Sequence, residues 1–236
     1  MGEVHSIKYK DHDVLFHDVL ESGHNMDMNI LTNDLYSGRP DHRFSEITSL
    51  IDSGSVVYDI GAYIGTFSIP LALEGMEVHA FEGFPDNFDR LKKNLSPYDN
   101  ITAHLVAVSN ENKTVKSQFD NCMNQPDSPY REINYRIFDE YILEHNIPNP
   151  DYVKIDIEGM ETIALHGMKN LLENVRPIFQ IGYHVGQATE SDGYPGFTSV
   201  ENGGFDFKTF SDLDYTVTPN NFTSWGEYTC IPRENQ

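Results

Sequence analysis

Cysteine and long apolar runs are scarce in this sequence of 236 residues. Cys122 and Cys230 are its two cysteines, and they lack CxxC spacing, so we expect buried thiols and neither a disulfide framework nor a structural zinc site. No stretch reaches the roughly eighteen apolar residues of a membrane-spanning helix. Residues 1–11 lack the apolar run of a signal peptide, and we therefore expect a cytoplasmic protein with no membrane span.

Basic residues are also few. Lys and Arg number 16 against 37 Asp and Glu, which gives a formal net charge of −21. Such a surface repels a phosphate backbone, so we do not expect nucleic acid as a substrate or partner. The densest basic cluster, Arg90, Lys92 and Lys93, is interpreted as the solvated face of a helix.

The order of apolar segments predicts an α/β fold, a Rossmann-like core whose mostly parallel sheet carries helices on both faces. We expect one domain over 1–236, with a hairpin and polar extension in 1–40 and the core in 41–236. A loop insertion is expected near 185–204. Core strands are predicted at 55–60, 78–82, 103–108, 152–156 and 178–183, and a terminal strand pair at 213–218 and 227–231. Helices are predicted at 44–51, 64–74, 87–95, 137–144 and 160–173.

The first chemical motif follows the first core strand, where Asp59 precedes two glycines four residues apart, Gly61 and Gly65. Glycine lets backbone N–H groups approach a ligand closely, and the helix that follows favours a carboxylate at its start. A dinucleotide site would instead have glycine at position 59, in the order G-x-G-x-x-G. An acid there can attract an ammonium group, so the motif favours S-adenosylmethionine over a pyrophosphate.

The second motif ends the next strand, where Glu82 lies roughly twenty residues beyond the glycines. A carboxylate at this place can accept hydrogen bonds from both ribose hydroxyl groups. Asp59 and Glu82 together therefore predict a site for a nucleoside that carries an amino acid.

The residues expected to act on a substrate also lie at strand ends. In an open parallel sheet the ligand crevice lies beyond the carboxyl ends of the strands, where Asp156 and His184 should join Asp59 and Glu82. Either Asp156 or His184 can accept a proton from an acceptor hydroxyl, and Glu158 is a secondary catalytic candidate. Asp156, Glu158 and His184 can also provide ligands for a divalent ion, and the sequence leaves metal dependence open.

Over roughly 55–184 the chain resembles the FkbM-type methyltransferases. The matching segments are 59–66 (DIGAYIGT), 80–82 (AFE), 107–109 (AVS) and, most specifically, 154–161 (KIDIEGME). The resemblance implies the class I methyltransferase fold, S-adenosylmethionine as cofactor, and transfer of a methyl group to a hydroxyl of a sugar, lipid or polyketide-like product. It implies cofactor contacts from Asp59, Gly61, Ala62, Tyr63, Gly65, Thr66, Glu82, Gly83, Ala107 and Val108.

Three positions depart from the pattern of that family. Tyr63 stands where asparagine is usual, Gly83 where a proline usually follows the acid, and Gly182 where glutamate is common. Neither the change at Tyr63 nor the change at Gly83 removes a charge. The ring of Tyr63 can also lie near a sulfonium as a cation–π partner. The third change concerns the substrate side of the site.

The leading hypothesis is an O-methyltransferase for a small hydroxylated acceptor, in particular a carbohydrate unit. Tyr183, Tyr194, Phe197 and Trp225 are candidate aromatic platforms for this acceptor, and a place in the apolar core is the equal alternative for these rings. Two alternatives stay open: a nicotinamide-dependent oxidoreductase, which Asp59 disfavours, and a nucleoside-binding module without turnover, which Gly182 motivates. The sequence does not indicate the oligomeric state.

Overall fold

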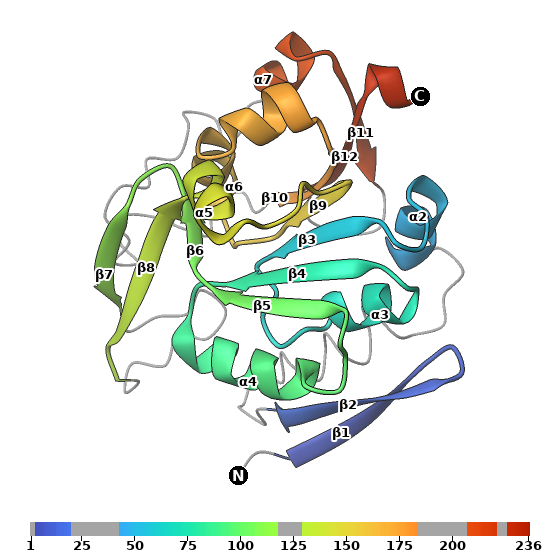
Figure 1. The fold of residues 1–236 in the computed structure, drawn as a ribbon, viewed down its shortest axis with the longest axis vertical. Coiled ribbons are helices and arrows are strands. Elements are labelled where there is room, and N and C mark those ends of the chain that lie inside the picture. Colours follow the sequence, from blue (N-terminus) through green and yellow to red (C-terminus); the bar gives the residue numbers. More distant parts are fainter. Residues whose placement is uncertain (1–2, 20–42, 118–128, 184–206, 221–225) are drawn as a thin grey trace.

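A seven-stranded sheet forms the centre of the computed structural model, which describes residues 3–19, 43–117, 129–183, 207–220 and 226–236. The strand order is β11-β12-β10-β9-β3-β4-β5 (Figure 1). Strands β5, β4, β3, β9 and β10 are parallel, whereas β12 is antiparallel to both of its neighbours. We call the edge where the five parallel strands end the carboxyl edge.

The strands are β1 (Glu3–Tyr9), β2 (His12–Val19), β3 (Val56–Ile60), β4 (Glu77–Glu82), β5 (Ile101–Leu105), β6 (Ala107–Ser109), β7 (Lys113–Ser117), β8 (Arg131–Ile137), β9 (Tyr152–Ile155), β10 (Ile178–Tyr183), β11 (Tyr215–Asn220) and β12 (Gly226–Pro232). The α-helices are α2 (Arg43–Leu50), α3 (Ser68–Leu73), α4 (Pro85–Leu95), α5 (Phe138–His145), α6 (Glu161–His166) and α7 (Phe207–Asp212). A π-helical turn covers Leu171–Val175 and a 3-10 turn covers Arg233–Asn235.

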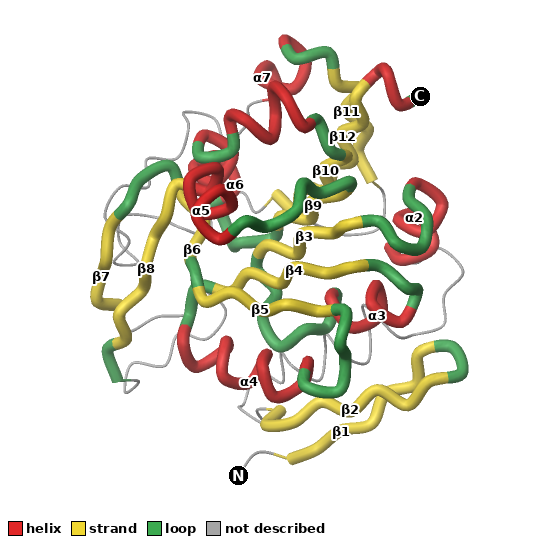
Figure 2. The backbone as a smooth tube through the Cα atoms, viewed as in Figure 1, coloured by secondary structure: helices red, strands yellow, loops and turns green. Residues whose placement is uncertain are grey.

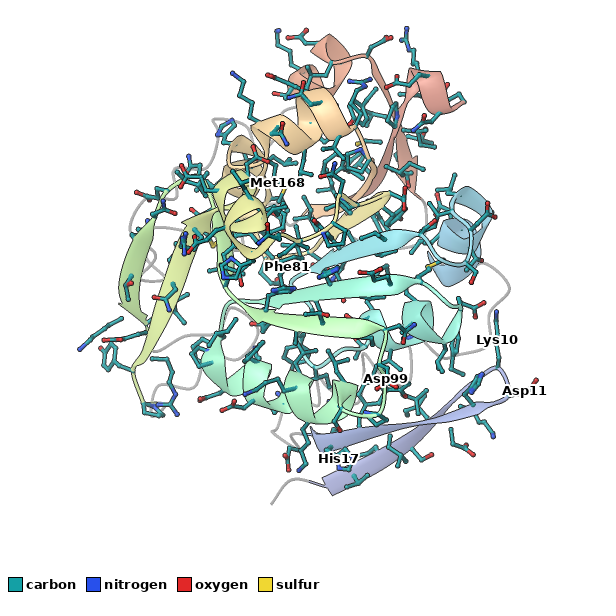
Figure 3. The ribbon with its side chains drawn as sticks, in the orientation of Figure 1. Lys10, Asp11, His17, Phe81, Asp99 and Met168 are labelled. Atoms are coloured by element: carbon teal, nitrogen blue, oxygen red, sulfur yellow. The ribbon has the colours of Figure 1, made fainter. Side chains whose placement is uncertain are left out.

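Each face of the sheet has its own apolar core, as alternation along buried strands requires. On one face, β3 and β4 pack with α2, α3, α4 and the β1–β2 hairpin. On the other, Tyr58, Phe81 and Val153 pack with α5, α6 and α7, and Figure 3 shows Phe81 and Met168 in this interior. Figure 2 shows helices on both sides of the central strands. The predicted α/β, doubly wound fold class is therefore confirmed. In the described parts of the chain, no helix is long and apolar enough to cross a membrane.

The predicted N-terminal hairpin is also present, with its turn at Lys10 and Asp11 (Figure 3). It packs against α4, where the buried side chain of Asn94 accepts a hydrogen bond from the backbone N–H of His17 (2.7 Å) and donates one to the carbonyl of Ile64 (2.9 Å). One amide thus connects the hairpin to the segment between the two glycines.

The prediction that Arg90 lies on a solvated helix face is wrong. Lys92 and Lys93 are exposed, but Arg90 is buried and donates from Nε to the carbonyl of Asp18 (3.1 Å). The hairpin covers this part of α4. The spacing of residues within the helix does not indicate that Asp18, far away in the sequence, contacts Arg90.

Two predicted elements are each interrupted. The strand expected at 103–108 is β5 and β6, separated by Val106, because β6 leaves the central sheet to join a second sheet of order β6-β8-β7. The helix expected at 160–173 ends at His166, and the π-helical turn follows. Gly167 stands at this break, where an added Cβ would lie 1.9 Å from the carbonyl oxygen of Ser109. Strands β7 and β8 and helix α7 were not predicted.

Replacement of Asn94 by alanine should destabilise the fold. The buried N–H of His17 and carbonyl of Ile64 would both lose a partner, at a cost of about 3 kcal/mol in the free energy of unfolding. Urea denaturation measures this loss, and Lys92→Ala on the exposed side of α4 is the control, expected to stay within about 0.5 kcal/mol of wild type. Equal stability of Asn94→Ala and wild type would contradict the connection.

Candidate functional site

The segment 61–65, which we call the glycine turn, is held tightly at the carboxyl edge. Gly61 has φ +81°, and a Cβ on it would lie 2.0 Å from the carbonyl oxygen of Asp156. The backbone N–H groups of Gly61 and Ala62 both donate to the carbonyl of Phe81, at 2.9 and 3.0 Å. Glycine at position 61 therefore allows the ends of β3, β4 and β9 to meet.

Tyr63 adopts a left-handed conformation, with φ +54°. Asparagine tolerates this region better than most residues, which gives a physical reason for the asparagine usual at this place. The guanidinium carbon of Arg90 lies 5.2 Å from the centre of the Tyr63 ring. Arg90 is thus the cation that this ring contacts here, and its contact with a sulfonium stays a prediction.

Glu82 connects the second motif to the first. Its Oε2 accepts the backbone N–H of Tyr63 (2.9 Å) and its Oε1 accepts that of Phe84 (2.8 Å). A carboxylate has about four acceptor positions, so each oxygen of Glu82 can accept more than one hydrogen bond. Glu82 is 8% exposed and fixed in place by these bonds before any ligand arrives.

The other residues expected to contact the cofactor differ in their placement. Gly83 lies against Ala107, since a Cβ on Gly83 would be 2.9 Å from the Ala107 Cβ. Val108 is buried in the core with α5 and α6. Thr66 is buried, and Gly65 has φ +92° with Leu91 and Leu95 of α4 close to it. Gly83 and Ala107 thus lie together, and Val108 points into the protein core.

Asp59 is completely buried in β3, and both of its carboxylate oxygens are bonded. Ser68 donates to Oδ2 (2.6 Å), and Nζ of Lys154 donates to Oδ1 (3.1 Å). Lys154 also donates to the carbonyl of Gly61 (3.2 Å) and lies 4.0 Å from Oδ2 of Asp156. The acid expected to attract a ligand ammonium is thus already paired with the ammonium of Lys154.

The pairing of Lys154 with Asp59 was not predicted, although the sequence of β9 carries a signal for it. Lys154 is the one charged residue of the buried strand β9, and it is in register with Asp59 of β3. A lysine in such a strand needs a carboxylate partner. The neighbouring strand supplies one.

The segment after β9 forms a tight turn around one buried acid, Glu161. The backbone N–H of Asp156 donates to the carbonyl of Ile60 (3.0 Å), and the Asp156 side chain is 29% exposed. Glu158 has φ +55°, which is costly for a residue with a side chain and is typical of functional sites. Oε1 of the buried Glu161 accepts the N–H groups of Ile157 and Gly159, each at 3.1 Å, and so fixes the turn.

Gly182 of β10 lies beside Asp156, because a Cβ on Gly182 would be 3.3 Å from the Asp156 Cγ. His184, Tyr194, Phe197 and Trp225 lie outside the described residues, as does the loop at 185–204; for Tyr183 only the backbone, in β10, is described. Within the described residues, no group of three His, Cys, Asp or Glu side chains is placed to hold a metal ion. Metal dependence therefore stays open.

A cavity of about 600 Å³ opens elsewhere, between the end of β5, strands β7 and β8, and α5. None of the predicted cofactor residues lines it. Two of its cations are paired with nearby acids, Arg136 with Glu144 and Lys113 with Glu111, each at 2.5 Å. Burial, helped by two nearby histidines, lowers the pKa of the adjacent His104 to about 4, so this ring is neutral at pH 7. The cavity is thus separate from the glycine turn.

Comparison with known proteins shows one family. Residues 59–214 match the family model described as "Methyltransferase FkbM domain". The hexuronic acid methyltransferase AglP of Haloferax volcanii is 28% identical over 132 residues, which cover 52% of this chain and 54% of that protein. The crystal structure of methyltransferase FkbM from Methylobacillus flagellatus KT superposes with a TM-score of 0.53 at 21% identity, covering 77% of this chain and 44% of that one. The chain thus spans about half the length of both.

Replacement of Gly61 by alanine should abolish the close contact of the glycine turn with β9. We expect affinity for S-adenosylhomocysteine, measured by calorimetry, to fall about 100-fold because the added Cβ displaces the turn. Gly54→Ala is the matched control, since Gly54 has a similar φ of +89° but nothing within 4 Å of the added Cβ. If both variants bound as wild type does, the glycine turn would not belong to the cofactor site.

Proposed function

Because this chain belongs to the FkbM methyltransferase family, we propose that it transfers the methyl group of S-adenosylmethionine to a hydroxyl oxygen of a sugar unit. The observation that carries the proposal is the convergence of both motifs at the carboxyl edge. Gly61 contacts the backbone of Asp156, and Glu82 binds the N–H of Tyr63. The family match confirms two predictions made from the sequence, the FkbM family and S-adenosylmethionine as cofactor.

The residues at this edge fit the cofactor. Gly61 lets the glycine turn pack closely against Asp156 at the carboxyl edge, and the carboxylate of Glu82 suits a ribose diol. Asp59 acts indirectly: it holds Lys154, and Lys154 holds the carbonyl of Gly61. Gly83 and Ala107, which lie together, form the neighbouring wall.

The bound cofactor supplies a methyl group that is already activated by positive charge on sulfur. The protein therefore has to orient the acceptor oxygen and remove its proton. Asp156 is the side chain best placed for the proton, because it is partly exposed and directly follows β9 at the point where Gly61 contacts the same residue. Glu158, in its left-handed conformation, shapes the turn beyond it.

Two observations support a neutral sugar hydroxyl as the acceptor. The relative AglP is named for action on a hexuronic acid, which is a sugar derivative. The described part of the edge presents carboxylates, Glu82, Asp156 and Glu158, on a chain with a formal charge of −21. Such a lining disfavours a carboxylate as the reacting group and suits hydroxyl donors. It also disfavours nucleic acid as substrate.

Transfer can be measured with methyl-labelled S-adenosylmethionine and the methyl glycosides of glucose, galactose, mannose and glucuronic acid. We expect label in a sugar ether, which survives mild alkali. Label released as methanol by alkali would instead indicate an ester and contradict the hydroxyl acceptor. Cofactor retained with no transfer to any of these sugars would favour a binding module without turnover.

Asp156→Asn tests the proposed base. We expect the transfer rate to fall about 100-fold or more, because loss of a general base typically costs this much, while affinity for S-adenosylhomocysteine stays within about threefold. Asp99→Asn, at the opposite edge of the sheet before β5, is the matched control and should keep full activity. An active Asp156→Asn enzyme would exclude this residue as the base.

A further inference from the structure

A row of buried polar side chains crosses the sheet face that α2 covers, on β9, β10 and β12. Tyr152 donates its hydroxyl to Oε1 of Gln180 (2.8 Å), and Nε2 of Gln180 donates to Oε1 of Glu227. Because the tyrosine hydroxyl occupies the amide oxygen, the NH₂ group of Gln180 must face Glu227. Gln180 is 1% exposed and Glu227 5% exposed, so the carboxylate is held in a fixed position inside the protein.

The strand register places Glu227 at the same level as Asp156. Ile155 is in register with Ile181, so the next pair along β9 and β10 is Asp156 with Gly182. Gly182 is in turn paired with Glu227 across β10 and β12. We call these three residues the edge row: an acid, a glycine and an acid on three adjacent strands at the carboxyl edge.

Gly182 places no side chain between the two acids. A Cβ on Gly182 would lie 3.4 Å from Oδ1 of Asp156, which shows that the Asp156 carboxylate packs directly against this glycine. Paired residues of an antiparallel ladder project to the same face, so Glu227 projects to that face on the other side of Gly182. With strands about 4.8 Å apart, the backbones of β9 and β12 are about 10 Å apart, which suits one six-membered sugar ring with a hydrogen bond at each side.

We propose that the edge row is the sugar subsite of this enzyme and that Glu227 is its specificity-determining residue. One ring hydroxyl lies toward Asp156, and a neighbouring ring hydroxyl donates a hydrogen bond to Glu227. When the methyl group is transferred, the acceptor oxygen forms the new O–C bond, the C–S bond breaks with its electron pair left on sulfur, and the hydroxyl proton passes to Asp156. The ligand class is therefore a sugar with two neighbouring hydroxyl groups. This inference rests on the proposed function for its reaction, but the sugar site can be tested without turnover.

The test measures sugar binding, by calorimetry or saturation-transfer NMR, to the protein saturated with S-adenosylhomocysteine. The sugars are methyl α-D-glucopyranoside, methyl α-D-galactopyranoside and methyl α-D-mannopyranoside. We expect Glu227→Gln to weaken the tightest of these sugars about tenfold, the effect of one hydrogen bond to a charged acceptor. Affinity for S-adenosylhomocysteine should stay within about twofold of wild type.

Deoxy analogues separate recognition from a general structural effect. Removal of the hydroxyl that faces Glu227 should weaken binding to wild type more than binding to Glu227→Gln, because the variant has already lost the charged acceptor. An equal loss in both proteins for every deoxy position would overturn the assignment. Absence of binding of all three sugars to the wild-type protein would overturn it as well.

Two further variants control for folding. Gly182→Ala adds one methyl group against the Asp156 carboxylate, in the middle of the edge row, and should weaken sugar binding without loss of S-adenosylhomocysteine binding. Glu46→Gln is the matched control, because Glu46 is another acid on this side of the sheet, accepts a hydrogen bond from Thr229 (3.2 Å) and lies on α2, outside the edge row. It should bind sugar as wild type does, and an equal loss in Glu46→Gln and Glu227→Gln would contradict a specific role for Glu227.

The outcomes also separate this inference from the proposed function. Sugar binding that depends on Glu227, without methyl transfer, would refute the reaction and support the subsite. Methyl transfer to a sugar with full activity in Glu227→Gln would support the reaction and refute the subsite.

Discussion

The buried ion pair between Asp59 and Lys154 joins the glycine motif to strand β9, which Asp156 directly follows. It connects the neighbouring central strands β3 and β9 at a separation of 3.1 Å. Two charges removed from water are costly unless further hydrogen bonds compensate them. Ser68 supplies one on the acid, and the carbonyl of Gly61 accepts another from the lysine. The ammonium group of Lys154 thus fixes the glycine turn against the strand that ends at Asp156.

The rest of the carboxyl edge is built around that fixed turn. The backbone of the turn donates to Phe81 and to Glu82, so β4 is connected to β3 at the same point. The Glu161 carboxylate fixes the next turn because it accepts the backbone N–H groups of Ile157 and Gly159, and Asp156 lies partly exposed between the two turns. The side chains that we propose for cofactor recognition and proton removal are therefore positioned by the sheet, and the edge row extends the same framework to β12.

Sequence patterns predicted the parts of the fold that are determined by residues close together in the chain. Strongly apolar strands such as β3 and β10, the hairpin, and the acids at strand ends could be located from period and motif alone. Strands β7 and β8 were missed because they alternate half-buried and exposed positions with many polar residues. The breaks at Val106 and Gly167, the burial of Arg90 and the position of Glu227 depend on partners distant in the chain, which a single sequence does not reveal. Lys154 differs, because a single charge in a buried strand already indicates a paired carboxylate.

A double-mutant cycle on Asp59 and Lys154, measured by urea denaturation and by calorimetry with S-adenosylhomocysteine, tests the account most directly. Asp59→Asn and Lys154→Met should each cost about 3–5 kcal/mol in stability, since either leaves a buried charge without its counter-charge, and the double variant should cost clearly less than the sum. Lys154→Met should also weaken cofactor binding, because the carbonyl of Gly61 loses its donor. Additive losses of stability, with wild-type affinity for S-adenosylhomocysteine in every variant that folds, would contradict the claim that this ion pair organises the site.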